Sequence, residues 1–193
     1  YYVSDIPFGS NDQIKTVIIG DGITSIGRNV FSKCNALTSV TISNSVTTIR
    51  ENAFSSCDNL ESIEIPDSVA IIMDGAFSDC GRLESITLPD TVTSLGPSIF
   101  KNCTGLKNIT LPNNIKTIPN EAFSGCGLLT DVAIPDTVVS IGISAFEECS
   151  IIENIVIPDT VKSIGKCAFK DCRKLKSLDI PSAVSSIEDS TFE

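Results

Sequence analysis

The sequence predicts an α/β repeat solenoid, a coil in which each 23-residue repeat buries its apolar face by stacking on its neighbours. Three observations lead to this fold class: a strict period, a strand pattern and a helix pattern within each period. The period is set by the nine phenylalanines, which stand 23 residues apart at positions 8, 31, 54, 77, 100, 123, 146, 169 and 192. A fixed period of this length, without insertion or deletion, is typical of solenoids.

We therefore expect one continuous domain over residues 1–193, with eight 23-residue turns from Phe8 to Thr191. Residues 1–7 are expected to form an incomplete repeat or a cap. The sequence begins at Tyr1 and shows no signal-peptide pattern, so we interpret it as a segment of a longer array.

The first part of each repeat has the pattern of a short strand. Within residues 83–88, Ile86 and Leu88 lie on one face and Ser85 and Thr87 on the other, a period of two that indicates a β-strand. Pro89–Asp90 follows, and it predicts a tight turn because proline cannot donate to a ladder and aspartate can bond nearby backbone. A second extended piece comes next, as at residues 161–164. Glycine follows that piece at Gly96, Gly142 and Gly165, where we expect a positive φ.

The segment around each phenylalanine has a helical spacing. In one repeat the apolar residues Ile141, Ala145, Phe146, Cys149 and Ile152 lie at offsets 0, 4, 5, 8 and 11, which is one face of a short helix. A stack with ~10 Å helices on one face and strands ~4.8 Å apart on the other should curve, with the sheet on the inside.

Seven of the eight cysteines also follow the period, each three residues after a phenylalanine: Cys34, Cys57, Cys80, Cys103, Cys126, Cys149 and Cys172. Equivalent Cβ atoms in stacked repeats are separated by at least the ~4.8 Å strand spacing, whereas a disulfide requires ~3.8 Å. Zinc requires cysteines that converge on a point, not a column along an axis. We predict a ladder of buried, reduced thiols. Cys167 lies off the pattern and is expected to be exposed; whether it is reactive stays open.

Composition argues against several function classes. The formal net charge of −10 disfavours nucleic acid, which requires clustered Lys and Arg, and disfavours anionic lipid surfaces. No apolar run approaches the ~20 residues of a membrane-spanning helix, so we expect no direct membrane insertion.

No set of side chains indicates catalysis. The chain has no histidine, which rules out Ser–His and Cys–His chemistry. Glu61, Glu64 and Glu84 should lie close together on the strands, but an open solvated surface offers no pocket to perturb their pKa values. We expect no enzyme activity and no cofactor.

A column of aspartates after the prolines is the best metal candidate, with Asn113 in register: Asp67, Asp90, Asp136 and Asp159. Stacked carboxylates suit calcium, whose ligands are oxygens. The simpler interpretation is that each aspartate caps its own tight turn. Calcium binding therefore stays open.

The pattern Leu-x-x-Ile-x-Leu-Pro-x-x-Val-x-x-Ile-Gly-x-x-Ala-Phe-x-x-Cys resembles the BspA-like (Treponema-type) leucine-rich repeats of bacterial and protist surface proteins. Residues 83–103 match it nearly throughout, with Ile99 where alanine is usual, and residues 129–149 also match it nearly throughout, with Val132 where isoleucine is usual. The resemblance implies a right-handed curved leucine-rich repeat array, with a parallel β-sheet on the concave face and short helical or 3-10 segments on the convex face. It also implies an extracellular or cell-surface location and a role in adhesion or protein contacts, with no common ligand and no catalytic residues.

A partner would dock on the outward positions of the strands, which can vary without touching the core. Most of them carry small polar residues, but Ala133 and Val156 are apolar neighbours in one column, and Leu128 and Ile151 are apolar neighbours just before the strand. We predict a protein-contact patch. Its residues are Asn108, Thr110, Leu128, Asp131, Ala133, Ile151, Glu153, Asn154 and Val156. Self-association through this patch, or burial of Leu128 and Ile151 at the core edge, are the alternatives.

The sequence thus predicts a non-enzymatic surface or secreted repeat protein that mediates adhesion or protein–protein interaction with an unidentified protein or cell-surface partner. The alternative is a purely structural spacer or scaffold segment of a larger cell-surface protein. It stays open because the outward columns contain no aromatic residue and no arginine, the usual anchors of a tight interface.

Overall fold

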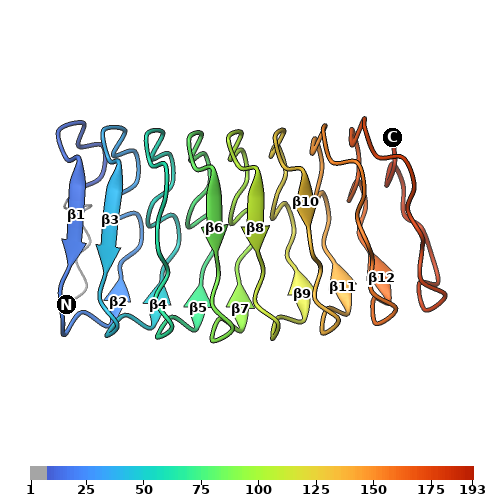
Figure 1. The fold of residues 1–193 in the computed structure, drawn as a ribbon, viewed down its shortest axis with the longest axis horizontal. Coiled ribbons are helices and arrows are strands. Elements are labelled where there is room, and N and C mark those ends of the chain that lie inside the picture. Colours follow the sequence, from blue (N-terminus) through green and yellow to red (C-terminus); the bar gives the residue numbers. More distant parts are fainter. Residues whose placement is uncertain (1–7) are drawn as a thin grey trace.

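The computed structural model describes residues 8–193, and the expected cap at residues 1–7 lies outside the described residues. The chain winds into a coil of stacked repeats (Figure 1). In that view the front strands run downward and the return strands run upward while the chain advances from left to right, so the coil is right-handed.

Each repeat contributes to two parallel strand layers. The strand face, as we call the first layer together with the Pro–Asp edge that follows it, covers residues 16–23 and their equivalents up to 177–184. It comprises β1 (Thr16–Ile19), β3 (Ser39–Ile42), β6 (Ser85–Thr87), β8 (Asn108–Thr110), β10 (Asp131–Val132) and the bridge between Asn154 and Ser177. The return layer comprises β2 (Ser25–Ile26), β4 (Thr48–Ile49), β5 (Ile71–Ile72), β7 (Ser94–Leu95), β9 (Thr117–Ile118), β11 (Ser140–Ile141) and β12 (Ser163–Ile164). The register pairs each residue with its equivalent 23 positions away, as Thr16 with Ser39.

The phenylalanines form one continuous stack through the coil. Neighbouring rings are nearly parallel, and their centroids lie between 5.2 Å (Phe123 and Phe146) and 5.9 Å (Phe169 and Phe192) apart. The six rings from Phe54 to Phe169 are almost completely buried. Because an aromatic side chain buries a large apolar area and prefers offset stacking, this column is the centre of the core.

The prediction of short helices beside the phenylalanines is wrong, because none of the described residues is helical. Two residues per repeat have left-handed backbone, for example Asn52 (φ 53°) and Ser56 (φ 57°) on either side of Phe54. A left-handed residue turns its carbonyl off the helix axis, so no right-handed helix can continue through it. Backbone N–H groups donate instead to the next repeat, from Asn52 to Asp74 O (2.9 Å), Phe54 to Ala76 O (2.9 Å) and Ser56 to Ser78 O (2.8 Å).

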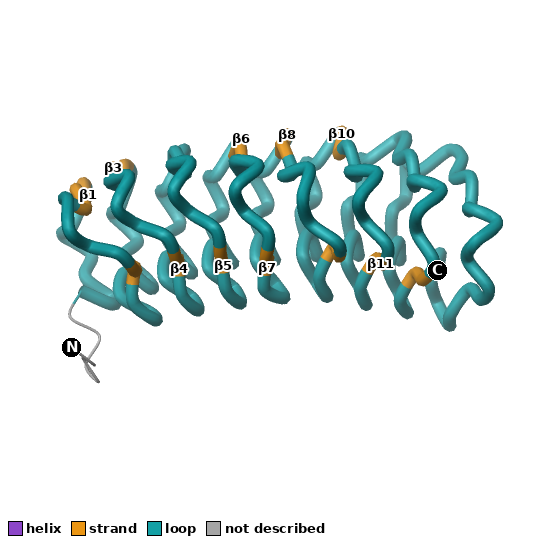
Figure 2. The backbone as a smooth tube through the Cα atoms, turned by 90° about the horizontal axis from the view of Figure 1, so that it is seen from below, coloured by secondary structure: helices purple, strands orange, loops and turns teal. Residues whose placement is uncertain are grey.

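The missing helices also change the expected shape. Figure 2 shows the repeats side by side in a gently bowed stack. We expected the stack to curve because of the ~10 Å diameter of a helix. On the phenylalanine side, however, neighbouring rings are only 5.2–5.9 Å apart, close to the ~4.8 Å spacing of strands. The two sides of the coil therefore advance by similar amounts per repeat and have little reason to splay.

The prediction of a positive φ at the glycines after the return strands is wrong, because Gly142 and Gly165 are not among the residues with left-handed backbone. These glycines instead allow close packing. A Cβ on Gly142 would lie 2.5 Å from the backbone nitrogen of Asn120, and one on Gly165 would lie 2.6 Å from that of Ile143. The backbone of the preceding repeat occupies the space that a side chain would need.

Both strand layers are interrupted within the described residues. In the return layer β7 does not pair with β9. The residue that normally donates here, such as Gly142 to Ile118 O (2.8 Å), is Pro119 in this repeat, and proline has no N–H. On the strand face, residues 62–65 make no backbone hydrogen bond with the described residues around them, so β3 and β6 stay unconnected.

Candidate interaction surface

The cysteine column is a structural ladder of unpaired thiols. All eight cysteines are free, and the six from Cys34 to Cys149 are buried. Each ladder thiol donates to the carbonyl of a phenylalanine in the preceding repeat, as Cys103 Sγ to Phe77 O (3.1 Å). Burial raises the pKa of the ladder thiols, and it raises the pKa of Cys172 to about 12. Cys167 is half-buried, which is less exposed than predicted.

The outward positions of the strand face form straight columns. Asp131 lies beside Asn108 and Thr110 lies beside Thr87, each in parallel register. Because side chains of a strand alternate between its two faces, the residues between them, such as Ile109 and Val132, point into the core and are buried. An outward residue can therefore change without altering the packing beneath it.

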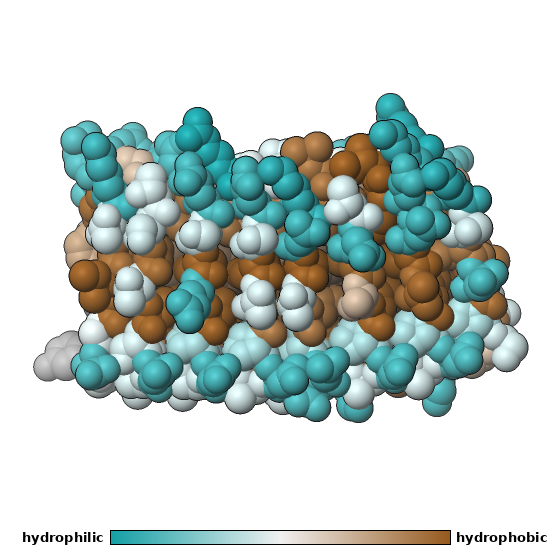
Figure 3. All heavy atoms as spheres, in the orientation of Figure 1, coloured by the Kyte–Doolittle hydropathy of each residue, from teal (hydrophilic) through white to brown (hydrophobic). Residues whose placement is uncertain are grey.

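The structure places the nine predicted contact residues on this face or at its upper edge. Eight are exposed, and Ile151 is partly buried. Among residues 8–193 Val156 is the most exposed large apolar side chain, at 79%, and Leu128 is 44% exposed. In Figure 3 apolar surface reaches the upper edge of the face, to the right of centre.

The apolar members do not form one contiguous patch, however. Leu128 and Ile151 precede the strands, whereas Ala133 and Val156 lie five residues further along, beyond a row of polar positions. In that row Glu153 accepts a hydrogen bond from Lys176, with 2.6 Å between Oε2 and Nζ. This bond from Lys176 lowers the pKa of Glu153 below its usual value. The surface is therefore two apolar lines separated by a polar line.

The three glutamates considered for catalysis do not interact with one another, and two of them form ion pairs with basic residues instead. Glu84 pairs with Lys107 (3.1 Å), and Glu61 lies 4.0 Å from Arg82. Glu64 is exposed and has neither an ion pair nor a hydrogen bond with the described residues. The structure thus brings no acid–base pair together from these side chains.

The aspartate column lies along the lower edge of the strand face. Asp90 accepts a hydrogen bond from the backbone N–H of Asn113 (2.8 Å), so it caps the next repeat rather than its own. Asp67, Asp136 and Asp159 are exposed. Within residues 8–193, no three or more His, Cys, Asp or Glu side chains are grouped so that they could hold a metal ion.

Sequence reasoning missed one property of this surface, which is its one-sided charge. The strand segments and their Pro–Asp edges carry acidic residues but no lysine or arginine in any repeat. The signal was present in the sequence once the repeats were aligned by their period.

Within residues 8–193 the structure has no helix that is long and apolar enough to cross a membrane.

The family described as "BspA type Leucine rich repeat region (6 copies)" matches residues 2–129 and 116–193. No curated protein matches the chain.

Solved structures share the fold. A leucine-rich repeat protein from Eubacterium ventriosum is 26% identical, with a TM-score of 0.77 over 93% of this chain and 58% of that one. A leucine-rich repeat protein of T. pallidum is 25% identical, with a TM-score of 0.69 over 88% and 69%. A protein of Faecalibacterium prausnitzii described as a leucine rich cell surface protein is 29% identical, with a TM-score of 0.61 over 87% of this chain. The present chain spans 60% of the length of that last protein.

Proposed function

The chain belongs to the BspA-type leucine-rich repeat family, and from that membership we propose that it is a non-enzymatic module of a cell-surface or secreted protein that mediates protein–protein contact, including adhesion. The observation that carries the proposal is the exposure of Val156 on a rigid face that otherwise presents mainly small polar side chains. The similarity to a protein described as a cell surface protein supports the location.

Exposed apolar residues at the C-terminal end of the strand face support a contact site. Leu128 and Val156 are 44% and 79% exposed, and Ala133 extends the line of Val156 into the neighbouring repeat. Isolated apolar residues on a surface are common, but rows of them beside polar residues are typical of interaction sites. Because each side chain stands on the backbone of a packed repeat, binding would order little of the protein.

A spacer function is the second candidate, and the earlier repeats favour it. From β3 to β8 the outward strand positions are Ser, Thr, Asn and one Glu. Side chains of this kind rarely dominate the binding energy of an interface. In this interpretation the coil holds other parts of a longer protein apart and presents no binding site.

A pair of matched variants separates the two candidates. L128S/V156S removes the exposed apolar groups at the proposed site, whereas I18S/I23S removes side chains of nearly equal exposure, 77% and 48%, at the other end of the coil. Binding to a panel of immobilised extracellular proteins and the molecular mass in solution are measured for both variants and for the unchanged chain.

The proposed site predicts that L128S/V156S loses binding or self-association, that I18S/I23S retains it, and that both keep the thermal midpoint of the unchanged chain. Equal binding by all three proteins, or none by any, would leave the spacer function as the better account.

A further inference from the structure

Charge is distributed unevenly between the strand face and the rest of the coil. The strand and Pro–Asp edge of every repeat, residues 16–23 and their equivalents up to 177–184, contain no lysine and no arginine. They hold eight of the 24 acidic residues: Asp21, Glu64, Asp67, Asp90, Asp131, Asp136, Asp159 and Asp179. The other 16 acidic residues nearly balance the 14 basic ones, so this face carries almost all of the net charge of −10.

Eight of the 16 acidic residues elsewhere are in ion pairs, most of them with a lysine or arginine of an adjacent repeat. Glu84 pairs with Lys107, Glu121 with Lys101 and Glu153 with Lys176. None of the eight ion pairs among the described residues uses a carboxylate of the strand face.

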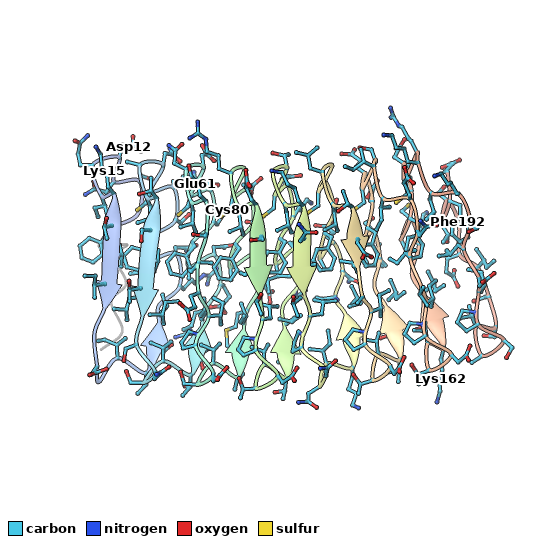
Figure 4. All side chains as sticks on the ribbon, in the orientation of Figure 1. Asp12, Lys15, Glu61, Cys80, Lys162 and Phe192 are labelled. Carbon is cyan, nitrogen blue, oxygen red and sulfur yellow. The ribbon has the colours of Figure 1, made fainter. Side chains whose placement is uncertain are left out.

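The strand-face carboxylates are all exposed. Two of them accept hydrogen bonds, Asp21 from Ser43 and Asp90 from Asn113. Figure 4 shows Lys15 and Glu61 at the upper edge of the strands and Lys162 at the lower edge.

Two pairs of these carboxylates, Asp67 with Asp90 and Asp136 with Asp159, stand at equivalent positions of adjacent repeats. Equivalent residues in adjacent repeats are ~4.8 Å apart, which is less than the Debye length of ~8 Å at physiological salt. Their fields therefore add over the face and would steer a cationic partner toward it. The small Ser and Thr side chains of the earlier repeats leave room for a close approach.

An independent feature lies within the same acidic surface. Val156 is 79% exposed, and Asp179 follows it in the same outward column, while Asp159 stands three residues further along the chain. A small cation would gain no favourable contact from an exposed apolar side chain. A segment that offers both an apolar residue and flanking positive charges would satisfy both features.

We infer that the strand face docks a Lys- and Arg-rich segment of a partner protein, with an apolar residue of that segment seated on Val156. The inference rests on the proposed function, because it gives the chemistry of the partner at the same surface. The negative face repels nucleic acids and anionic lipids, which excludes them as occupants.

The test uses three labelled synthetic peptides of equal length: alternating Lys and Val, alternating Lys and Ser, and alternating Glu and Val. Their binding is measured by fluorescence anisotropy at low and high salt. The strand-face variant is D131N/D136N/D159N. The matched control, D58N/D74N/E148Q, neutralises three exposed carboxylates outside the strand face, none of which is in an ion pair, so both variants change the net charge equally.

We expect the Lys–Val peptide to bind most tightly, less tightly at high salt, and about tenfold more weakly to the strand-face variant, with less than a twofold change for the control. The inference is overturned if both triple variants weaken binding equally, if the Glu–Val peptide binds as well as the Lys–Val peptide, or if the Lys–Ser peptide matches the Lys–Val peptide. In any of these cases the proposed function still stands if L128S/V156S loses protein contact and I18S/I23S does not.

Discussion

The phenylalanine side and the strand face of the coil are held together differently. On the phenylalanine side backbone hydrogen bonds of the same kind join every described repeat to the next, from Ser10 to Ser32 at one end and from Asp171 to Glu193 at the other. The stacked rings and the thiol ladder follow the same line without a gap. The strand face, by contrast, has no paired strand at residues 62–65, and beyond β10 the described residues retain a single bridge.

This difference separates the side that holds the repeats together from the side on which we propose that a partner binds. The side chains that hold the repeats together are nearly identical in each repeat, because each must fit the same neighbour above and below. The outward residues of the strand face meet solvent, so they are free to vary in charge and polarity. We expect changes to the phenylalanine side to affect stability, and changes to the strand face to affect binding.

The largest expected effect is loss of stability at alkaline pH. Burial raises the pKa of the seven ladder thiols above the unfolded value of ~8.5. A group whose pKa is raised on folding contributes its full stability below the unfolded pKa and loses it as pH rises. Above about pH 9 each thiol should lower the free energy of unfolding by about 1.4 kcal/mol per pH unit. Urea unfolding under reducing conditions, from pH 8 to pH 10.5, measures this loss.

The double variant C103A/C126A is the control for this alkaline transition. It removes two of the titrating groups, so the free energy of unfolding should fall less steeply with pH, and the number of protons released on unfolding should be smaller by two. An unchanged slope would show that lysine or tyrosine titration, not the thiol ladder, causes the transition.

The next effect concerns a single ring of the stack. Phe100 is fully buried between Phe77 and Phe123, so F100A should cost ~3–5 kcal/mol by removing apolar contact and leaving a cavity. T110A, at an exposed position of the strand face, should change the free energy of unfolding by less than ~0.5 kcal/mol. Similar losses for the two variants in urea denaturation would remove the distinction between the two sides.

Amide hydrogen exchange tests the gap in the strand face. Residues 62–65 have no backbone hydrogen bonds with the described chain, whereas β6 is paired with β8. We expect amides 62–65 to exchange roughly tenfold faster or more than those of β6. Equal protection of the two segments would mean that the strand layer is continuous in solution.

The smallest effect is expected from an ion pair on the phenylalanine side. Glu121 accepts hydrogen bonds from Lys101 (2.6 Å) and Ser98 (2.9 Å), and these lower the pKa of Glu121. A carboxylate with a lowered pKa stabilises the fold above its unfolded pKa of ~4.3 and loses that contribution as pH falls through its folded value.

E121Q should therefore cost less than ~1 kcal/mol at pH 7, because the pair is partly exposed, and the cost should shrink as pH falls below the unfolded pKa of ~4.3. Glu148, which also has left-handed backbone, provides the control E148Q. An equal effect of E148Q on the urea midpoint would show that the Lys101 pair contributes nothing specific.

Most of the architecture could be predicted from the sequence because the period is strict. Identical residues 23 positions apart must occupy equivalent places in a stack, so the Phe and Cys columns and the strands follow from the spacing alone. The candidate site was less predictable. Spacing placed Val156 on an outward column, but the exposure of Leu128 and the partial burial of Ile151 depend on how each repeat edge packs.

The sequence by itself thus determined the coil, its register and the reduced thiol ladder, because these depend only on which residues repeat. Only the tertiary structure decided the conformation beside each phenylalanine. The apolar spacing there fits a helix, but Asn52 and Ser56 take left-handed backbone, a conformation that ordinary residues adopt only when neighbouring structure stabilises it. That stabilisation comes from backbone hydrogen bonds to the next repeat, such as Phe54 to Ala76, and such bonds exist only once the repeats have stacked.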